Sequence, residues 1–406
     1  MPGGGWLHKR PRQDHSPVNR LLGRIPEWMR YPLAVFLASR LLFFAIAAVD
    51  VAVRHSNLQT AFSNWDGFWY LHTSVEWYPH HYGTAAGDWG TLGFLPVYPG
   101  LIWLLQLLTP LSTFGSGLLV SMVLGVVATL TVCRLAYEWW GEAPMRRAAL
   151  FWSLWPGTIV FSMVYSEGCT VTLVAGAFLL MARRRWLLAG LLAGAATAVE
   201  PMALAVIPAC AAGAMNEAYE QGLSTPGQLR RFLTGPGLMA LLSLWGAGAF
   251  AFFLWRWTGS PLASYKIQHG AWSNGSSLLA VPHRVGQIFT DLSSSGYPHY
   301  LGPGFNLNDL VALLGALFLL FGLWRMWNWR DTVPLAASVY CCAGALFVLT
   351  SGQTSPNPRM LVCLFPLLIT VGVEQTGRRR AMLLTVTLLL TLVMSWLTFV
   401  GSWLLP

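Results

Sequence analysis

Charged residues are scarce in this chain, and their scarcity excludes an ordinary soluble fold. Only 10% of the 406 residues are Asp, Glu, Lys or Arg, whereas a soluble domain carries about 25%. Hydrophobic residues make up 55% of the chain, and its mean hydropathy is +0.53. Uncharged runs near the length that crosses a bilayer recur along the whole sequence. The composition therefore predicts an all-α polytopic membrane protein.

Several chemical patterns are also missing. The six cysteines all lie in apolar stretches, without a CxxC pair, so they are expected to be small buried hydrophobic residues rather than disulfide or metal-binding thiols. No internal repeat of 20–50 residues is evident. The one modest loop on the predicted inner side, 215–236, carries no nucleotide-binding pattern.

The net charge of +9, from 25 basic and 16 acidic residues, invites a nucleic-acid partner. In a membrane protein, however, a basic excess usually sets orientation. Six basic residues precede the first apolar segment, and thirteen lie in the later loops that would face the same side of the membrane as this arm. Only four lie in the loops that would face the other side. This asymmetry predicts a cytoplasmic N-terminus and no nucleic-acid partner. The four basic residues expected on the outer side are Arg54, Lys266, Arg284 and Arg359.

The charge distribution also selects a topology. We expect a basic cytoplasmic arm at 1–32 and a single transmembrane domain at 33–406, which begins with a retained span at about 33–53. Placing every basic cluster inside requires 93–110 to lie flat on the outer surface, with 148–182 and 187–214 as outward hairpins. About eleven membrane segments result, with outer loops at 54–114 and 258–307. The further apolar segments lie at about 93–110, 115–136, 148–163, 168–182, 187–199, 201–214, 237–257, 308–324, 334–350, 360–373 and 381–404.

The densest chemical signal is Asp66, which lies among Trp65, Phe68, Trp69 and Tyr70 just beyond the first span. Aromatic faces stack on sugar C–H faces, and apolar surroundings leave a carboxylate poorly solvated and basic. The pattern indicates a general base beside a sugar or a lipid phosphate. An interfacial aromatic belt that happens to include one acid is the alternative.

Pro96 and Pro99 open the predicted flat segment, and their spacing predicts a rigid corner with no regular helix before Pro99. Glu167 and Glu200 lie at the tips of the two predicted hairpins. Each is either a functional acid or a cap on the helix that follows, since a carboxylate suits a helix N-terminus.

Arg359 lies at the predicted outer start of a late span, where an anionic phosphate headgroup would be found. Arginine binds phosphate bidentately, although a simple lipid-headgroup anchor remains the alternative. Lys266 and His269, in the outer loop 258–307, are further candidates for neutralising a phosphate.

Two of these motifs resemble the "WDxxxY" and "FFPLYP" pair of the PIG-V mannosyltransferases, which belong to the GT-C superfamily of membrane glycosyltransferases. Here the pair consists of Trp65–Tyr70 and Phe94–Pro99. Weaker matches follow in order at Tyr165-Ser166-Glu167, at Gln268–Trp272 and from Pro358 to Pro366. The resemblance runs from about residue 40 to 370, and the Arg-rich composition suits a bacterial, actinobacterial member.

The resemblance implies a GT-C fold with a flat helix in the first outer loop, a polyprenyl-phosphate-mannose donor and catalysis on the outer face of the cytoplasmic membrane. Asp66 would accept the proton of an acceptor hydroxyl in an inverting transfer. Arg359, helped by Lys266 or His269, would neutralise the phosphate. Contacts with the sugar or acceptor are expected from Trp65, Trp69, Tyr70, Tyr98, Tyr165, Glu167, Glu200 and Trp272.

Two departures from the family pattern bear on the substrates. The family has an Arg-containing turn where this chain has Glu200, and a Tyr after the late Arg where this chain has Met360. An added acid would not favour an anionic donor beside it, so Glu200 is expected to face acceptor hydroxyls.

Other functions stay open at this stage. A transporter or flippase of a lipid-linked sugar would share broken helices and membrane acids, and a non-catalytic subunit could keep the fold. A cavity in which Asp66 and Arg359 face each other would favour the enzyme. The acceptor is open among glycolipid, glycan and protein. We expect a metal-free site, although a divalent cation (Mg²⁺ or Mn²⁺) stays open.

Overall fold

The structure is a computed structural model that describes residues 25–85, 87–294, 306–374, 376–401 and 404. Residues 1–24 of the predicted basic arm, 1–32, therefore lie outside the described residues. In the described part the chain is helical, with no β-strand and a single isolated bridge between Ser276 and Ser351. The all-α architecture predicted from the sequence is confirmed.

The α-helices occur in the following order: α2 (Glu27–Arg54), α3 (Leu58–Phe62), α4 (Asp66–Glu76), α5 (Val97–Leu108), α6 (Thr113–Trp140), α7 (Glu142–Leu154), α8 (Glu167–Ala182), α9 (Trp186–Ala196), α10 (Val206–Gln221), α11 (Pro226–Thr234), α12 (Pro236–Leu242), α13 (Trp245–Thr258), α14 (Ala263–Gly270), α15 (Ala280–Ser294), α16 (Leu307–Asn328), α17 (Leu335–Thr350), α18 (Pro358–Cys363), α19 (Phe365–Glu374) and α20 (Gly377–Trp396). Short helical turns separate some of them: η1 (Thr91–Gly93), η2 (Pro156–Ser162), η3 (Pro201–Ala205) and η5 (Leu397–Gly401).

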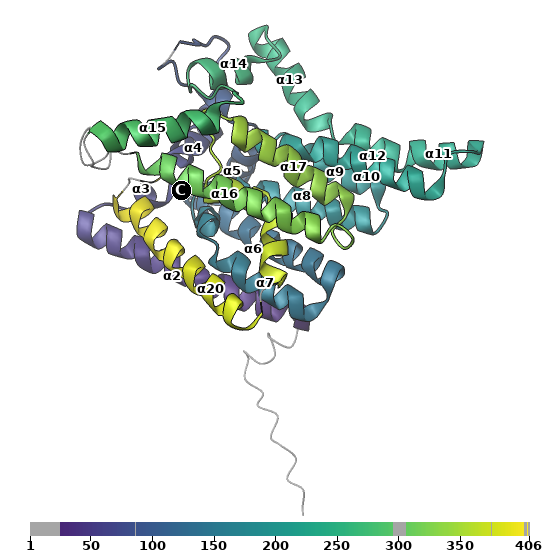
Figure 1. Cartoon of the computed structure of the whole chain (residues 1–406). Helices are drawn as coiled ribbons and strands as arrows, with labels where there is room; N and C mark the ends of the chain where they lie inside the picture. Colours follow the sequence, from purple (N-terminus) through teal and green to yellow (C-terminus); the bar gives the residue numbers. More distant parts are fainter. Residues whose placement is uncertain (1–24, 86, 295–305, 375, 402–403, 405–406) are drawn as a thin grey trace, which may run out of the picture.

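Within the described residues, four helices are long and apolar enough to cross a membrane: α2, α6, α16 and α20 with its extension to Phe399. Two further pairs of consecutive helical segments, each bent at a short break, raise the number to six if each pair counts as one span. Helices α5, α9 and α17 are shorter apolar helices. The chain is thus a polytopic membrane protein, while the predicted total of eleven membrane segments stays a prediction. Figure 1 shows α2 and α20 side by side along one flank of the bundle.

Several predicted segments are broken rather than continuous. The segment predicted at 148–163 ends as α7 at Leu154 and turns into η2 at Pro156, and η2 makes an angle of 104° with α8. The segment predicted at 237–257 is broken after Leu242, where the stretch Pro226–Leu242 makes an angle of 49° with α13. Leu364 interrupts the segment predicted at 360–373, between α18 and α19. Non-helical backbone at such depth is tolerated where protein buries it.

The predicted absence of regular helix before Pro99 is wrong. Helix α5 begins at Val97, with Pro96 as its N-cap. Proline is tolerated here because the first N–H groups of a helix have no intrahelical acceptor, so the missing N–H of Pro99 removes no helical hydrogen bond. The segment packs against α4 and α6.

Three of the basic residues predicted on the inner side, Arg134, Arg147 and Arg183, mark one end of the bundle, here called the basic end. Arg134 at the end of α6 lies over the ring of Trp28 in the first turn of α2, 5.2 Å from its centroid. Glu138 accepts from Arg183, in the turn after α8, at 2.7 Å. Arg147 donates to a carbonyl near the end of α19 at 2.7 Å. The placement of this end on the cytoplasmic side stays a prediction.

Arg40 lies inside α2 and is only 2% exposed. Its guanidinium donates to the hydroxyl of Thr158 at 3.0 Å and to that of Ser162 at 3.3 Å, and it lies 4.5 Å from the centroids of the Phe36 and Phe43 rings. A buried charge is costly unless hydrogen bonds compensate it. Arg40 therefore fixes η2, which packs against α18 and so helps to position the site.

Candidate active site

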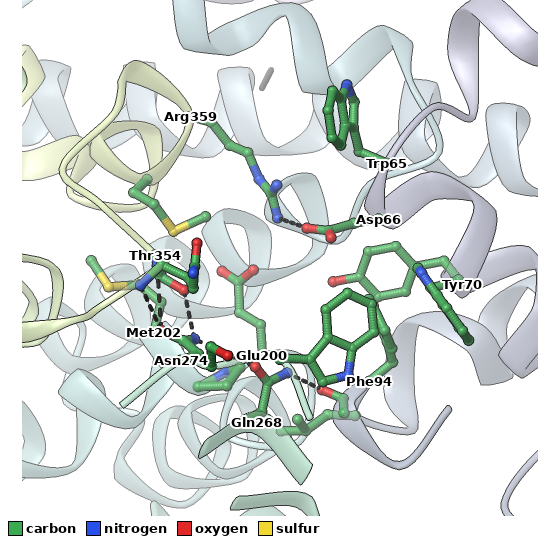
Figure 2. A pocket seen from close by; sticks show the side chains of 18 of the residues that line it. Trp65, Asp66, Tyr70, Phe94, Glu200, Met202, Gln268, Asn274, Thr354 and Arg359 are labelled. Carbon is green, nitrogen blue, oxygen red and sulfur yellow. Dashed lines mark hydrogen bonds and ion pairs between the residues drawn. The ribbon is translucent and has the colours of Figure 1, made fainter. Parts of the chain in front are cut away.

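A cavity of about 630 Å³ opens at the end of the bundle opposite the basic end. Its lining comes from α4, the segment before α5, the turn between α9 and η3, the segment from α14 to residue 274, and residues 353–360 with Phe347. These segments are far apart in the sequence. Figure 2 shows Arg359 and Asp66 facing each other across one side of it, with the Glu200 carboxylate pointing into the space between the walls.

Asp66 is the first residue of α4, and the backbone just before it is constrained. Trp65 has a φ of 60°, a conformation that costs a bulky residue about 1–3 kcal/mol and that clusters at functional sites. The turn is fastened from outside, because the Tyr165 hydroxyl donates to the Asn64 carbonyl at 2.9 Å. A hydrogen bond of 2.8 Å between the Val164 amide and the Phe62 carbonyl adds to this attachment.

Arg359 joins two acids in one cluster, of which Asp66 is partly exposed and Glu167 is buried. Its Nη2 lies 2.6 Å from Asp66 Oδ2, and its side chain is 11% exposed. Its Nε donates to Glu167, whose side chain has no exposed surface. The guanidinium also lies over the Tyr165 ring, 4.6 Å from the ring centroid. Arg359 is the one Lys or Arg among the described residues that line the cavity.

Close backbone packing sets the position of Arg359. Asn357 caps α18 by accepting from the Met360 amide at 2.9 Å, and Trp155 Nε1 donates to the Pro358 carbonyl at 2.8 Å. Gly157 in η2 allows this approach, since a Cβ there would lie 1.9 Å from that carbonyl oxygen. The short helix α18 is thereby clamped against η2.

Glu167 and Glu200 occupy different environments. Glu167 begins α8, yet its carboxylate binds Arg359 rather than serving as a cap alone. Glu200 lines the cavity and accepts from Ser166 at 3.0 Å and from Cys363 at 3.1 Å. The Glu167 side chain has no exposed surface and contacts Arg359, so its predicted role in contacting sugar or acceptor stays a prediction.

Tyr70 extends this polar network. Its hydroxyl lies 2.6 Å from Ser166 Oγ, and because Ser166 donates to Glu200, Tyr70 must be the donor to Ser166. Burial, followed by the negative charges of Glu167, Glu200 and Asp66, raises the pKa of Tyr70 well above its usual value. The phenol therefore stays a neutral hydrogen-bond donor at physiological pH.

Aromatic side chains form one wall of the cavity. Trp272 lies edge-on to Trp69 and Phe94, with centroids 5.2 and 5.6 Å apart, and stacks on Trp89 at 5.2 Å. Trp65 also lines the cavity. Tyr98 is fully buried behind this wall, with its ring 4.8 Å from that of Tyr70. Tyr98 and Tyr165 therefore support the wall and lie outside the cavity lining, and their predicted contact with a sugar or acceptor stays a prediction.

Three apolar side chains, here called the apolar side, also line the cavity, where Figure 2 shows the polar Thr354 and Asn274 next to Met202. The three are Met202 from η3, Phe347 from α17 and Met360 from α18, and Figure 2 shows Met202 on the side away from Trp65 and Tyr70. The cavity thus combines an aromatic wall, an apolar side and a cluster of charged groups. Met360, noted in the sequence only as a departure from a family motif, belongs to this apolar side.

Lys266 and His269 lie outside this cavity, so the structure does not bring them to Arg359. Helix α14 turns Ala263 and Ile267 inward, and this register leaves Lys266 and His269 exposed on the other face. Gln268 is the α14 residue that lines the cavity, where its amide donates to the Gly93 carbonyl at 2.9 Å.

Asn274 is a lining residue that sequence reasoning missed. Its Oδ1 accepts from Ser351 Oγ at 2.7 Å and from the amides of Gln353 and Thr354 at 3.2 and 3.3 Å. Asn274 thereby attaches the segment after α14 to the segment that leads to Arg359. A lone Asn in a polar loop carries no sequence signal for this role, because its partners lie almost eighty positions away in the chain.

Among the described residues, no group of three His, Cys, Asp or Glu side chains is placed to hold a metal ion. The expected metal-free site and the alternative of a divalent cation both stay predictions.

Comparisons with known proteins give little more. No family model matches the chain, and neither does any curated protein. Among solved structures, the chain is similar to the apo form of the Archaeoglobus fulgidus oligosaccharyltransferase, with a TM-score of 0.48 and 14% sequence identity. The alignment covers 90% of this chain and 56% of the other, so the chain spans about half the length of that protein. This similarity does not by itself establish a shared fold.

Proposed function

We propose that the protein is an inverting membrane glycosyltransferase of GT-C type, which moves mannose from polyprenyl-phosphate-mannose to a hydroxyl acceptor. One observation carries the proposal. Asp66 and Arg359, from distant parts of the chain, lie 2.6 Å apart in a cavity that is also lined by tryptophans and by apolar side chains. The choice of mannose and of a polyprenyl carrier rests on the resemblance to the PIG-V family.

The cavity offers a separate surface for each part of such a donor. Arg359 would bind the phosphate, since a guanidinium matches phosphate oxygens bidentately. The apolar side formed by Met202, Phe347 and Met360 would take the first isoprenoid units. Trp69 and Trp272 would stack on the sugar, because indole faces pack well against the C–H faces of a pyranose ring.

Asp66 would act as the general base. The acceptor oxygen attacks the anomeric carbon, its proton passes to an Asp66 carboxylate oxygen, and the bond from the anomeric carbon to the phosphate oxygen breaks. The bonding electron pair leaves with the polyprenyl phosphate, which is already stable as an anion. No strong general acid is needed, and attack from the face opposite the phosphate inverts the anomeric configuration.

Arg359 would couple donor binding to activation of the base. In the structure the guanidinium is shared between Asp66 and Glu167. A phosphate that binds Arg359 competes for the same N–H groups and so frees the Asp66 carboxylate to accept a proton. Glu167, buried on the far side, would keep the guanidinium in place while this exchange occurs.

The site would face the outer side of the cytoplasmic membrane. The support is the positive-inside rule together with the grouping of Arg134, Arg147 and Arg183 at the basic end, opposite the cavity. A cytoplasmic N-terminus follows from the same assignment.

The test is Asp66→Asn in purified protein supplied with polyprenyl-phosphate-mannose and a panel of methyl glycosides as acceptors. General-base catalysis supplies about 10²–10⁴-fold, so transfer should fall by at least about 10²-fold. The amide keeps the shape of the side chain and can still hydrogen-bond, so expression and thermal stability should change little.

Asp88→Asn is the matched control, because Asp88 is an exposed acid of the same outer loop that lies outside the cavity lining. It should retain full activity. Wild-type turnover in Asp66→Asn would refute the assignment of the base. Transfer by neither the wild type nor any variant, over the whole acceptor panel, would count against the enzyme itself.

A further inference from the structure

A second cavity of about 570 Å³ lies next to the first. Helix α15 and the segment before it form one side, the start of α16 forms another, and Gly352 and Gln353 close it toward the first cavity. Gln353 lines both cavities. A single stretch of chain therefore separates the proposed reaction centre from a second hollow of similar size.

This dividing stretch is held firmly. The Gly352 amide donates to the Gly275 carbonyl at 2.7 Å, and the Ser277 amide donates to the Thr350 carbonyl at 2.7 Å. The Gln353 amide donates to Asn274 Oδ1 at 3.2 Å. With its backbone fixed in this way, Gln353 offers its amide group at the boundary, where a ligand that extends from one cavity into the other would meet it.

The second cavity is polar but nearly balanced in charge. Arg284 Nη1 lies 2.7 Å from Asp309 Oδ1, with side chains only 14% and 9% exposed, and Arg284 also donates to the Gly352 carbonyl. The pairing consumes the positive charge, and the carboxylate would repel an anion. A phosphate or an acidic glycan is therefore a poor match.

The other polar groups suit hydroxyl groups. Ser277, His283, Gln287 and Gln353 can each both donate and accept hydrogen bonds. A sugar hydroxyl also does both, so such a lining pairs with a glycan in several orientations. Apolar side chains are few in the described lining, which makes the cavity unsuitable for an isoprenoid chain.

We propose that the second cavity is an acceptor subsite, which binds a neutral sugar unit next to the unit that carries the attacking hydroxyl. The acceptor is then a glycan of at least two sugar units, whether free or attached to a lipid. This inference rests on the proposed transferase function, since the first cavity must be the place where the hydroxyl reacts.

The test compares acceptors of different length. Methyl glycosides of mannose, glucose and galactose, each as a monosaccharide and a disaccharide, are supplied with polyprenyl-phosphate-mannose. At least one disaccharide should be used about tenfold better in kcat/KM than its monosaccharide, since tenfold corresponds to the loss of one or two hydrogen bonds. The double variant His283→Ala/Gln287→Ala should lose this preference while it keeps the monosaccharide rate.

Thr290→Ala is the matched control, because Thr290 lies on the same helix but outside the cavity lining. It should keep the preference for the longer acceptor. A wild type without such a preference, or a preference that survives in the double variant, would overturn the subsite.

Binding without turnover separates this inference from the proposed function. Saturation-transfer NMR with the same disaccharides and the Asp66→Asn protein should show contacts that disappear when His283→Ala/Gln287→Ala is added. If transfer is absent in every protein but these contacts behave as expected, the second cavity is a sugar-binding site without a role as an acceptor subsite, and the enzyme assignment fails. If transfer occurs but the disaccharide contacts do not depend on these two residues, the subsite fails and the enzyme assignment stands.

Discussion

The two ends of the helix bundle carry the same kind of ion pair in different surroundings. At the basic end, Arg183 lies 2.7 Å from Glu138, with side chains 51% and 21% exposed. At the cavity end, Arg359 lies 2.6 Å from Asp66, with side chains 11% and 32% exposed, and it also binds the fully buried Glu167. The two ion pairs are almost equal in length, but the arginine at the cavity end is more deeply buried than the one at the basic end.

That difference in burial separates orientation from chemistry. Exposed pairs contribute about 0–1 kcal/mol, because water and ions screen them and long side chains lose entropy. A charge in the interior is costly to leave alone, so its partners are held in one geometry. In the predicted topology the basic end needs only its net charge, while the proposed reaction at the cavity end needs a particular arrangement of groups.

The largest expected effect comes from removing the buried cation. Arg359→Ala leaves Glu167 without its partner, and breaking a buried pair in this way costs about 3–5 kcal/mol. Transfer should also be lost, since no other Lys or Arg of the described lining can bind the phosphate. Thermal unfolding in detergent and the transfer assay measure the two effects.

Arg183→Ala is the corresponding change at the basic end and should cost no more than about 1 kcal/mol, with activity intact. The comparison fails if the two variants lose similar stability. Arg359→Lys sharpens it further, because an ammonium keeps the charge but cannot form the same fork, so stability should recover more than activity.

A smaller effect is expected from glycine packing. Gly157→Ala would place a Cβ 1.9 Å from the Pro358 carbonyl oxygen, and overpacking of this kind costs about 1–3 kcal/mol. Because the turn that carries Arg359 must shift, kcat should fall as well.

Gly227→Ala is the control variant, since Gly227 lies in α11 beside the basic residues, with open space around it. That change should leave kcat unaltered and stabilise the protein by up to about 1 kcal/mol. Equal kcat in the two variants would show that this packing does not position Arg359.

The smallest expected effect concerns Tyr70→Phe. Loss of its hydrogen bond to Ser166 should cost about 0.5–1.5 kcal/mol. The raised pKa of Tyr70 also predicts a pH effect. An unfolded tyrosine ionises near pH 10, while the folded one keeps its proton, so the contribution of Tyr70 is complete below pH 10 and falls as the pH rises further. Melting temperatures from pH 8 to 11 should therefore fall less steeply in Tyr70→Phe than in the wild type, and equal slopes would contradict this account.

Much of the helical frame could be predicted from the sequence, and particular residues show why. The long apolar runs that became α6 and α16 have few charges, and a bilayer leaves helix as the form that satisfies their backbone. The breaks could be anticipated at Pro156 and Pro201, but not between α18 and α19, where Leu364 carries no breaker signal. The start of α5 was predicted too late. Pro99 lies in the first turn of α5, where an N–H group has no intrahelical acceptor, so the proline does not prevent the helix from beginning before it.

The site was predicted in part. Trp65, Asp66, Trp69, Tyr70, Glu200, Trp272 and Arg359 all line the cavity. They had been singled out by their setting among apolar segments or by the resemblance to the PIG-V family. Lys266 and His269 were proposed from charge alone, and the register of α14 turns them away. Asn274 was missed because its partners are distant in the chain.

The sequence by itself determined that the chain enters a membrane and which end of the bundle is basic. Both are sums over residue types, and hydrophobic transfer and charge asymmetry depend little on detailed contacts. Only the tertiary structure decided that Arg359 meets Asp66 and Glu167, that Glu167 is buried behind the guanidinium, and that Gln353 separates two cavities. These facts depend on distances between remote segments, set by close contacts such as that of Gly157 with Pro358. Side-chain packing, which acts over a few ångströms, leaves no periodic trace in a single sequence.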